Sequence, residues 1–294
     1  MRRQTPTDQL VSIVVPTHNA SDSIAACLTS LVGQSYTNIE IIICDDASTD
    51  STLDIVSAIV DPRICIISSE INQGSSAARN RGVSLAAGEV VFFTDDDVET
   101  NRDWILNGLR YFSDDAVVGI EGKIVYVSAD YLPRYSDRTV QNLLGGEYMT
   151  ANAAYRKTAL VQAGPFDEAL WRYQDMDLAL RVQQLGRIVF AEDAVVCHMR
   201  ESYTVKSFMR EAIKIGLWLD FEKCHGDSNN RIGPVIYPSH IITILFPPLI
   251  LTKMVVHRHP NRRDILMLLL IYPRLVFERY IIWRWALHNR TIVI

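Results

Sequence analysis

Apolar residues alternate between two spacings along the first hundred positions of the chain. Short runs of β-branched and other apolar residues predict strands at residues 10–15, 39–44, 63–67 and 89–94. Apolar residues at helical spacing between these runs predict helices at residues 21–32, 52–60 and 75–87. Strands that alternate with helices in this way form parallel sheets with right-handed crossovers. We therefore expect a doubly wound, mostly parallel, Rossmann-like α/β sheet.

The same spacings continue less regularly after residue 100. They predict strands at residues 116–127, 148–155, 188–191 and 194–198, and helices at residues 101–112, 157–163, 174–184, 205–223 and 264–288. We expect one α/β domain over residues 1–225, with a nucleotide-binding half at about 10–100 and an acceptor half at about 101–200. Residues 226–294 are expected to form a helical tail of apolar and basic character.

Polar and acidic residues follow three of the predicted strands. They are Pro16, Thr17, His18 and Asn19 after the first strand, Asp45 and Asp46 after the second, and Asp95, Asp96 and Asp97 after the fourth. Ligands of doubly wound sheets bind beyond the carboxyl ends of the strands, so we expect these residues to share one rim. A helix cap accounts for Ser48, Thr49 and Asp50, but three consecutive aspartates exceed what one cap needs.

Asp95 and Asp97 suit a hard divalent cation at this rim. Mg²⁺ or Mn²⁺ commonly takes one or two protein carboxylates and completes its shell with substrate phosphates. The pair therefore predicts a metal-bridged nucleotide diphosphate. The sequence contains neither G-x-x-x-x-G-K-[ST] nor G-x-G-x-x-G, which argues against a P-loop ATPase and a dinucleotide dehydrogenase.

Several segments in order resemble the family-two glycosyltransferases, which have the GT-A fold. The resemblance covers about residues 10–200 and is carried by VSIVVPTHN (11–19), DDASTD (45–50), NQG (72–74), ARNRG (78–82), GE (88–89), TDDD (94–97), GPFDE (164–168) and QDMDL (174–178). It implies a metal-dependent transfer of one sugar, with inversion, from a nucleotide-sugar, commonly a UDP-sugar. The acceptor would be a hydroxyl of a glycan or a lipid-linked acceptor, in the synthesis of polysaccharide or cell-envelope glycan.

By matching positions, the resemblance also assigns residues to the donor and the metal. Asp46 would accept a hydrogen bond from the base, His18 stands where an aromatic residue often stacks on the base, and Asp96 would face the ribose or sugar. The donor-binding set is Pro16, Thr17, His18, Asn19, Asp46, Arg79, Asp95 and Asp96. Asp97, with Asp95, would bind Mn²⁺ or Mg²⁺. His198 is either a third metal ligand or a packed core residue.

The catalytic base implied by the resemblance is Asp175. An inverting transfer needs one carboxylate to take the proton of the attacking acceptor hydroxyl. The family places this acid second in a Glu-Asp pair, whereas this chain has Gln174 first. Asp177 lies about 200° further around the helix, so we interpret it as structural or supporting. An acid at a helix N-terminus also complements the helix dipole, so the alternative role of Asp175 is to stabilise its own helix. Gln174, Trp171 and Asn152 are the acceptor candidates.

Charge is divided unevenly between the body and the tail. The chain has 29 basic and 34 acidic residues, a net charge of −5, which argues against a nucleic-acid partner. Residues 253–294 carry a net charge of +6, which leaves −11 for the rest. Residues 232–252 have no ionised side chain, but prolines interrupt them. The helix at 264–288 is basic and apolar, typical of a helix in the lipid headgroup plane, or of one packed on the domain.

We therefore expect a peripheral or shallowly inserted protein at the cytoplasmic side of the cell membrane. The sequence lacks the Gln-x-x-Arg-Trp motif of processive synthases, which favours a single addition. Two alternatives remain at this stage. One is a catalytically degenerate nucleotide-sugar or glycan-binding module, because Gln174 replaces an acid. The other is a sugar-nucleotide pyrophosphorylase, although residues 16–19 do not match the glycine-rich basic loop of that class.

Overall fold

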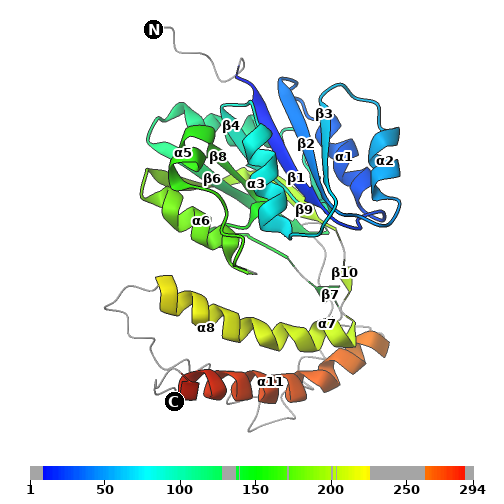
Figure 1. Ribbon diagram of the computed structural model, residues 1–294, viewed down its shortest axis with the longest axis vertical. Helices are drawn as coiled ribbons and strands as arrows, with labels where there is room; N and C mark the ends of the chain where they lie inside the picture. Colours follow the sequence, from blue (N-terminus) through cyan, green and yellow to red (C-terminus); the bar gives the residue numbers. More distant parts are fainter. Residues whose placement is uncertain are drawn as a thin grey trace. The chain divides into compact units, whose positions relative to one another are not determined.

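The computed structural model describes residues 9–127, 137–138, 140–170, 172–199, 201–202, 204–225 and 262–288. The chain divides into two compact units (Figure 1). Unit 1 comprises Met1–Tyr131 and Val140–Met199, and unit 2 comprises Leu132–Thr139 and Arg200–Ile294. The division therefore falls after Met199, whereas the sequence placed a domain boundary after residue 225.

Unit 1 is built on a sheet whose described strands run in the order β3-β2-β1-β4-β8-β6-β9-β5. Its first half is parallel and consists of β1 (Val11–Thr17), β2 (Ile39–Asp46), β3 (Ile64–Ser69) and β4 (Val90–Phe93). Every residue of β1 is buried. Helices cover both faces of such a sheet, which explains the continuous apolar runs that predicted these strands.

The second half of the sheet mixes directions. It contains β8 (Ala153–Arg156), β6 (Val117–Tyr126), β9 (Arg187–His198) and β5 (Val98–Thr100). β8 is antiparallel to β4 and β6, β6 is parallel to β9, and β5 is antiparallel to β9. The two strands predicted within 188–198 are one strand, which keeps pairing across a register shift. The predicted strand at 148–155 begins as the 3₁₀ turn η2 (Thr150–Asn152).

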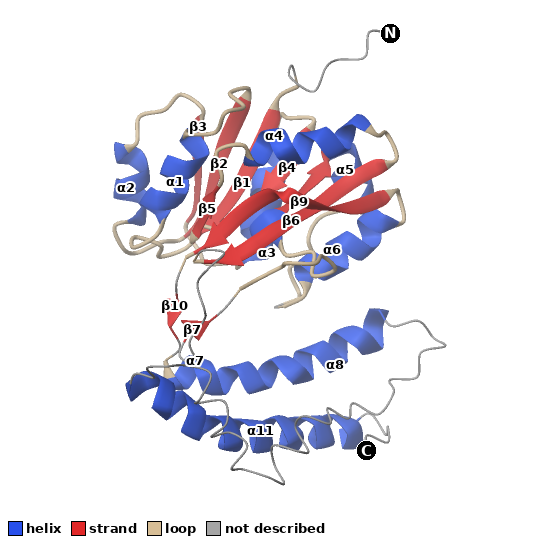
Figure 2. Cartoon of the chain, turned by 180° about the vertical axis from the view of Figure 1, so that it is seen from behind, coloured by secondary structure: helices blue, strands red, loops and turns tan. Residues whose placement is uncertain are grey.

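Helices pack on both faces of the sheet (Figures 1 and 2). The first face carries α1 (Ile24–Val32), α2 (Thr52–Ala58) and α4 (Trp104–Leu109, continued by η1, Arg110–Ser113); the second carries α3 (Ser75–Leu85), α5 (Lys157–Ala163) and α6 (Gln174–Gln183). Alternate residues of one strand serve the two cores: Ile13 lies in the first and Val14 in the second. The doubly wound prediction is confirmed for this parallel half.

The described residues of unit 2 are mainly helical. β7 (Asp137–Arg138) pairs antiparallel with β10 (Glu201–Ser202), and the helices are α7 (Val205–Arg210), η3 (Glu211–Ile213), α8 (Lys214–His225) and α11 (Arg262–His288). Leu219, Ile282 and Trp285 form its core, and the Trp285 indole donates to Asp220 at 2.6 Å. The predicted helices at 205–223 and 264–288 are confirmed. The apolar stretch at 232–252 lies outside the described residues.

No helix in the described part of the chain is both long and apolar enough to cross a membrane. Cys27 and Cys44 are buried and free, but Cys65 is exposed because β3 is the edge strand of the sheet.

Candidate active site

The carboxyl ends of β1, β2 and β4 meet at one rim, as the sequence predicted. Pro16 and Thr17 end β1, where Thr17 pairs in register with Asp45 of β2. The backbone N–H of His18 donates to Asp96 at 3.3 Å, which joins the β1 loop to the loop after β4. Five of the predicted residues therefore lie at a junction between neighbouring strands.

Asn19 ties the β1 loop to the loop after β2. Its backbone has a φ of 53°, its N–H donates to Ser48 Oγ at 2.9 Å, and its Oδ1 accepts from Thr49 N at 2.8 Å. Asp50 accepts from the N–H of Thr52, the first residue of α2, at 3.0 Å. Asn19 thus shapes the rim through loop contacts, while Asp50 accepts from the first N–H of α2. The N-cap residue of α2 is Ser51, without a side-chain cap hydrogen bond, and Ser48 and Thr49 contact Asn19, so the cap interpretation does not hold for those two residues.

Asp46 lies in a shell of donors at the start of α3. Its Oδ2 accepts from the N–H groups of Gln73 at 3.0 Å and Gly74 at 2.6 Å, and its Oδ1 accepts from Arg81 Nη2 at 2.8 Å. Burial alone would raise the pKa of Asp46, but these hydrogen bonds outweigh it and lower the pKa. Asp46 is therefore a carboxylate fixed as an acceptor.

Arg79 is a buried cation beside the aspartate motif. Its Nη2 lies 2.7 Å from Asp95 Oδ1, and its guanidinium carbon lies 5.9 Å from the Phe166 ring centroid. Its Nε and Nη1 atoms are buried and have no hydrogen-bond partner among the described residues. Buried N–H groups without partners are costly, so this guanidinium suits an anionic ligand that would satisfy them.

The structure brings His198 to the aspartate motif. β5 pairs with β9 so that Val98 lies opposite His198, and His198 Nε2 lies 3.3 Å from Asp97 Oδ2. His198 is buried, and its Nδ1 lies 3.1 Å from the Met199 carbonyl oxygen. A carboxylate oxygen and an imidazole nitrogen this close fit a site for Mn²⁺. The described residues contain no cluster of three or more His, Cys, Asp or Glu side chains with metal-binding geometry.

Asp96 has an unusual protonation equilibrium. Burial raises its pKa to about 6, and the negative charge of Asp95 adds to the effect. The backbone N–H of His18 partly opposes this shift. At neutral pH Asp96 is ionised although burial disfavours its charge, and a hydroxyl donor or a nearby cation would stabilise the ionised form.

Asp175 lies in the first turn of α6. The N-cap residue of this helix, Tyr173, has a left-handed φ of 63°. Burial raises the pKa of Asp175, and the charge of Arg79 opposes that rise. Its Oδ1 accepts from the Met176 N–H at 3.0 Å. Gln174 reaches across to α3, with its Nε2 3.3 Å from Ser75 Oγ. A carboxylate of raised pKa close to a buried arginine is suited to proton transfer.

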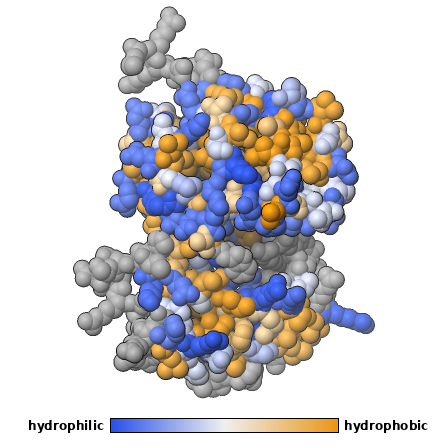
Figure 3. Space-filling model, viewed as in Figure 1, coloured by the Kyte–Doolittle hydropathy of each residue, from blue (hydrophilic) through white to orange (hydrophobic). Residues whose placement is uncertain are grey.

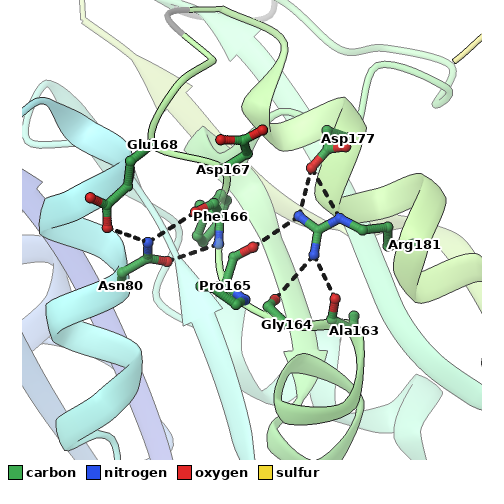
Figure 4. A pocket seen from close by; sticks show the side chains of 9 residues that line it. All are labelled: Asn80, Ala163, Gly164, Pro165, Phe166, Asp167, Glu168, Asp177 and Arg181. Atoms are coloured by element: carbon green, nitrogen blue, oxygen red, sulfur yellow. Dashed lines mark hydrogen bonds and ion pairs between the residues drawn. The ribbon is translucent and has the colours of Figure 1, made fainter. Parts of the chain in front are cut away.

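The second acid of this helix is structural, as the helical angle predicted. Asp177 Oδ2 accepts from Arg181 Nη2 at 2.6 Å, and Arg181 Nη1 donates to the Ala163 carbonyl at 2.6 Å (Figure 4). On the other side of the same turn, Asn80 bonds both the N–H and the carbonyl of Phe166, at 2.8 and 3.0 Å. These contacts fix the turn that leads to α6.

A cavity of about 580 Å³ opens beside that turn (Figure 4). It is lined by Asn80, Ala163, Gly164, Pro165, Phe166, Asp167, Glu168, Asp177 and Arg181. None of the predicted donor, metal or acceptor residues lines it. We therefore assign the active site to the rim and not to this cavity.

Two acceptor predictions have different outcomes. Asn152 is wrong as an acceptor residue, because it lies in the interior: its amide donates to the carbonyls of Lys123 and Ala194, and its oxygen accepts from Trp104 Nε1 at 2.8 Å. Its hydrogen-bonding groups hold β6, β9 and α4 together. Trp171 lies outside the described residues. Sequence reasoning also missed Arg81, whose signal was a second arginine in the ARNRG segment.

Known proteins share both the sequence pattern and the fold. The model of glycosyl transferase family 2 matches residues 12–165. The amylovoran biosynthesis glycosyltransferase AmsB of Erwinia amylovora is 31% identical over 235 residues, which are 73% of this chain and 78% of AmsB. The UDP-Glc:alpha-D-GlcNAc-diphosphoundecaprenol beta-1,3-glucosyltransferase WfaP of Escherichia coli is 45% identical over 89 residues. That match covers 30% of this chain and 36% of WfaP.

Solved structures resemble the whole chain at low sequence identity. The mannosyltransferase PcManGT from Pyrobaculum calidifontis, in complex with GDP-Man and Mn²⁺, has a TM-score of 0.59 at 19% identity, covering 95% of this chain and 86% of that one. TarS 1-349 of S. aureus, in complex with UDP-GlcNAc, has a TM-score of 0.56 at 21% identity, covering 96% and 92%.

The structural neighbours establish the GT-A fold, and the matched region contains the rim from the end of β1 through the aspartate motif. The family model spans more than half of the chain. The chain therefore belongs to glycosyl transferase family 2 and is a glycosyltransferase.

Proposed function

We propose that this glycosyltransferase moves one sugar, with inversion, from a UDP-sugar to a hydroxyl of a lipid-linked or glycan acceptor. One observation carries the proposal. Arg79 forms an ion pair with Asp95 of the aspartate motif. Its positive charge also opposes the rise in the pKa of Asp175 that burial causes. The donor-side acids and the candidate base thus share one buried cation, which is the arrangement that a transfer site needs.

The donor would lie with its base at Asp46 and its diphosphate at Arg79 and the aspartate motif. Asp46 is held as an acceptor, which suits the imide N–H of uracil. The name of WfaP specifies UDP-Glc, and the TarS structure contains UDP-GlcNAc. Both support a UDP-sugar, whereas the GDP-Man of PcManGT makes guanine the alternative to test.

Asp97 and His198 would hold Mn²⁺ or Mg²⁺, with Asp95 nearby. Their oxygen and nitrogen donors fit such an ion, and the remaining ligands would come from the diphosphate and water. When bound, the ion supplies positive charge that stabilises the departing diphosphate. Arg79 adds a second, fixed positive charge, with two nitrogen atoms, Nε and Nη1, available to donate to phosphate oxygens.

Asp175 would act as the general base. It would take the proton of the acceptor hydroxyl while that oxygen bonds to the anomeric carbon and the bond to the diphosphate breaks. Attack from the face opposite the leaving nucleotide inverts the anomeric configuration. The raised pKa of Asp175 makes it a stronger proton acceptor than an ordinary aspartate.

A transfer assay tests this function. We would incubate UDP-Glc, UDP-GlcNAc or GDP-Man with a synthetic GlcNAc-diphospholipid, in Mn²⁺ or in EDTA, and measure nucleotide release and product. We expect turnover with a UDP-sugar, loss of turnover in EDTA, and loss in Asp175→Asn. The control is Asp167→Asn, which changes an exposed aspartate outside the proposed site. An Asp175→Asn protein as active as wild type would contradict the assignment of the base.

We further propose that α11 places the protein at the cytoplasmic face of the membrane. One side of this helix packs in unit 2 through Leu275, Ile282 and Trp285. The other side exposes apolar residues at helical spacing: Leu269, Val276, Tyr280, Trp283 and Leu287. Figure 3 shows such apolar surface among hydrophilic residues on unit 2. Arg262 and Arg284 are exposed on the same helix and would favour anionic lipid.

The structure changes which face of α11 would meet lipid. At 100° per residue, one charged arc of this helix contains Arg274, Glu278, Arg284 and His288. Glu278 is buried, and its Oε1 accepts from Arg274 Nε at 2.9 Å, so this part of the arc faces the protein. The exposed apolar side is therefore the lipid-facing candidate.

Flotation with vesicles of phosphatidylglycerol and phosphatidylcholine tests the membrane proposal. We expect the full chain to float, and the double variant Leu269→Gln/Leu287→Gln to float much less. Val161→Gln is the control, because Val161 is an apolar residue of unit 1 with similar exposure. Undiminished flotation of the double variant would contradict a role for this face.

A further inference from the structure

A second arginine of α3 contacts the base-side carboxylate but has no role in the chemistry proposed above. Arg81 Nη2 donates to Asp46 Oδ1 at 2.8 Å and lies 3.4 Å from the Asp45 carbonyl. Its Nη1 donates to the side-chain oxygen of Gln73 at 2.9 Å. The Arg81 side chain is 27% exposed, whereas that of Asp46 is 4% exposed. Arg81 therefore lies at the outer edge of the Asp46 shell and bridges two polar side chains.

Gln73 is oriented by these contacts. Its backbone N–H donates to Asp46 Oδ2, and its carboxamide oxygen accepts from Arg81. Only the oxygen of a carboxamide can accept from a guanidinium, so the assignment of its two ends follows from the contact. The NH₂ group is then directed away from Arg81. Gln73 is exposed, so a ligand can reach this donor.

One guanidinium thus contacts an acceptor, Asp46, and sets the orientation of a donor, Gln73, whose backbone N–H also donates to Asp46. Asp46 presents a carboxylate oxygen that two backbone N–H groups and Arg81 hold in place. Gln73 presents an NH₂ group whose orientation depends on the same Arg81. An acceptor next to a donor complements a ring edge that carries an N–H beside a carbonyl oxygen.

We propose that Arg81 is a positioning residue that holds Asp46 and Gln73 as a paired acceptor and donor, which selects uracil over cytosine. The proposal rests on the proposed use of a nucleotide-sugar donor and adds the residue that sets its base specificity. Uracil offers an N3–H beside a carbonyl oxygen. Cytosine in the same pose turns a nitrogen lone pair towards the Asp46 carboxylate, which repels it.

UDP and CDP provide a matched pair of probes. They differ only in this edge of the base, so their affinity ratio isolates base recognition from diphosphate and metal contacts. We would measure the Kd of each nucleotide by titration calorimetry in Mn²⁺, for the full-length wild type, Arg81→Met, Arg81→Lys and Gln73→Leu. Arg187→Met is the control, because Arg187 also pairs with an aspartate, Asp114, at an exposed place away from the rim.

We expect wild type to prefer UDP. Loss of the charged hydrogen bonds of Arg81 should weaken UDP binding about ten-fold or more and leave CDP binding nearly unchanged, so the ratio falls. Arg81→Lys should restore part of the preference, since a lysine can hold Asp46 but not both partners in the same geometry. With saturating donor, kcat should change less than the donor KM.

Three results would overturn the proposal. Equal weakening of UDP and CDP in Arg81→Met would show a merely structural role. Tighter UDP binding would show that Arg81 covers Asp46 instead of positioning it. A UDP preference that survives in both Arg81→Met and the exposed Gln73→Leu would also overturn it, without touching the proposed function. Wild type that lacks a UDP preference would instead contradict the proposed donor together with this proposal.

Discussion

Arg79 and Asp95 form an ion pair of 2.7 Å in which the arginine is almost fully buried and the aspartate is partly exposed. The pair joins α3 to the loop after β4, and two further nitrogen atoms of the arginine, Nε and Nη1, have no hydrogen-bond partner among the described residues. The same cation opposes the rise in the pKa of Asp175. We therefore propose that Arg79 couples donor binding to the strength of Asp175 as a base.

Replacing Arg79 should change the pH dependence of catalysis. Without its positive charge, the pKa of Asp175 rises further, so the acid limb of kcat/KM should move to higher pH in Arg79→Met. The loss of charged hydrogen bonds to phosphate should also lower kcat/KM about ten-fold or more. A pH–rate profile measures both effects, with Arg187→Met as the control. An acid limb that stays in place would disconnect Arg79 from the base.

Ionisation of Asp96 should lower the free energy of unfolding of the metal-free protein as the pH rises. Its pKa is about 6 in the folded state, above its ordinary value of 3.8. The protonated side chain therefore contributes stability that is fully present below pH 3.8 and is lost as the pH rises through about 6. Asp96→Asn should be more stable than wild type at pH 7.5, by on the order of 3 kcal/mol, and the difference should vanish near pH 3.8. Urea denaturation at several pH values measures it. A difference independent of pH would contradict the shift.

Glu121 should be essential for the loop that follows Asn142. This buried carboxylate accepts from Asn142 Nδ2 at 3.0 Å and from the N–H groups of Gly146 at 2.6 Å and Tyr148 at 3.0 Å. Glu121→Ala would leave these donors unsatisfied and should lower the free energy of unfolding by about 3 kcal/mol. Glu121→Gln keeps an acceptor oxygen and should lose less. Chemical denaturation compares the two, and equal losses would argue against the role of the hydrogen bonds.

Gly82 should tolerate no larger side chain. A Cβ there would lie 2.5 Å from Val14 Cγ1 and 2.7 Å from Cys44 Sγ, where α3 packs on β1 and β2. Gly82→Val should cost about 1–3 kcal/mol through overpacking. It should also raise the donor KM, because α3 carries Arg79 and Arg81. Gly74→Ala is a useful contrast, since Gly74 has free space but a φ of +91°. Unchanged stability in Gly82→Val would show that the helix can shift freely.

The sequence predicted the parallel half of the sheet well, because strands buried on both faces read as continuous apolar runs. It missed β5, which has only three residues and is defined by its pairing with β9. It placed Asn152 near the acceptor because a polar residue beside the site suggests a contact. The three interior hydrogen bonds of Asn152 depend on strands and a helix that are distant from it in sequence. Long-range contacts of this kind have no local signature.

Long-range contacts also explain why the role of Arg81 and the covered side of α11 could not be predicted from the sequence. One motif contains both Arg79 and Arg81, but only the fold shows that they serve different carboxylates. The periodicity of α11 predicted a helix correctly. Which of its sides is covered depends on α8, so the burial of Glu278 in its pair with Arg274 could not be assigned from spacing alone.

The position of β5 restricts how the aspartate motif can move. β4 and β5 are separated in the sheet by three strands, a distance of about 19 Å in a flat sheet at the usual strand spacing. Only Thr94 to Asp97 connect them, and a fully extended chain of this length reaches about 18 Å. The sheet must therefore curve between β4 and β5, so that this short segment can join them. The Asp97 carbonyl also accepts from the Met199 N–H at 2.8 Å, so a backbone contact and a side-chain contact both hold the aspartate motif at the end of β9.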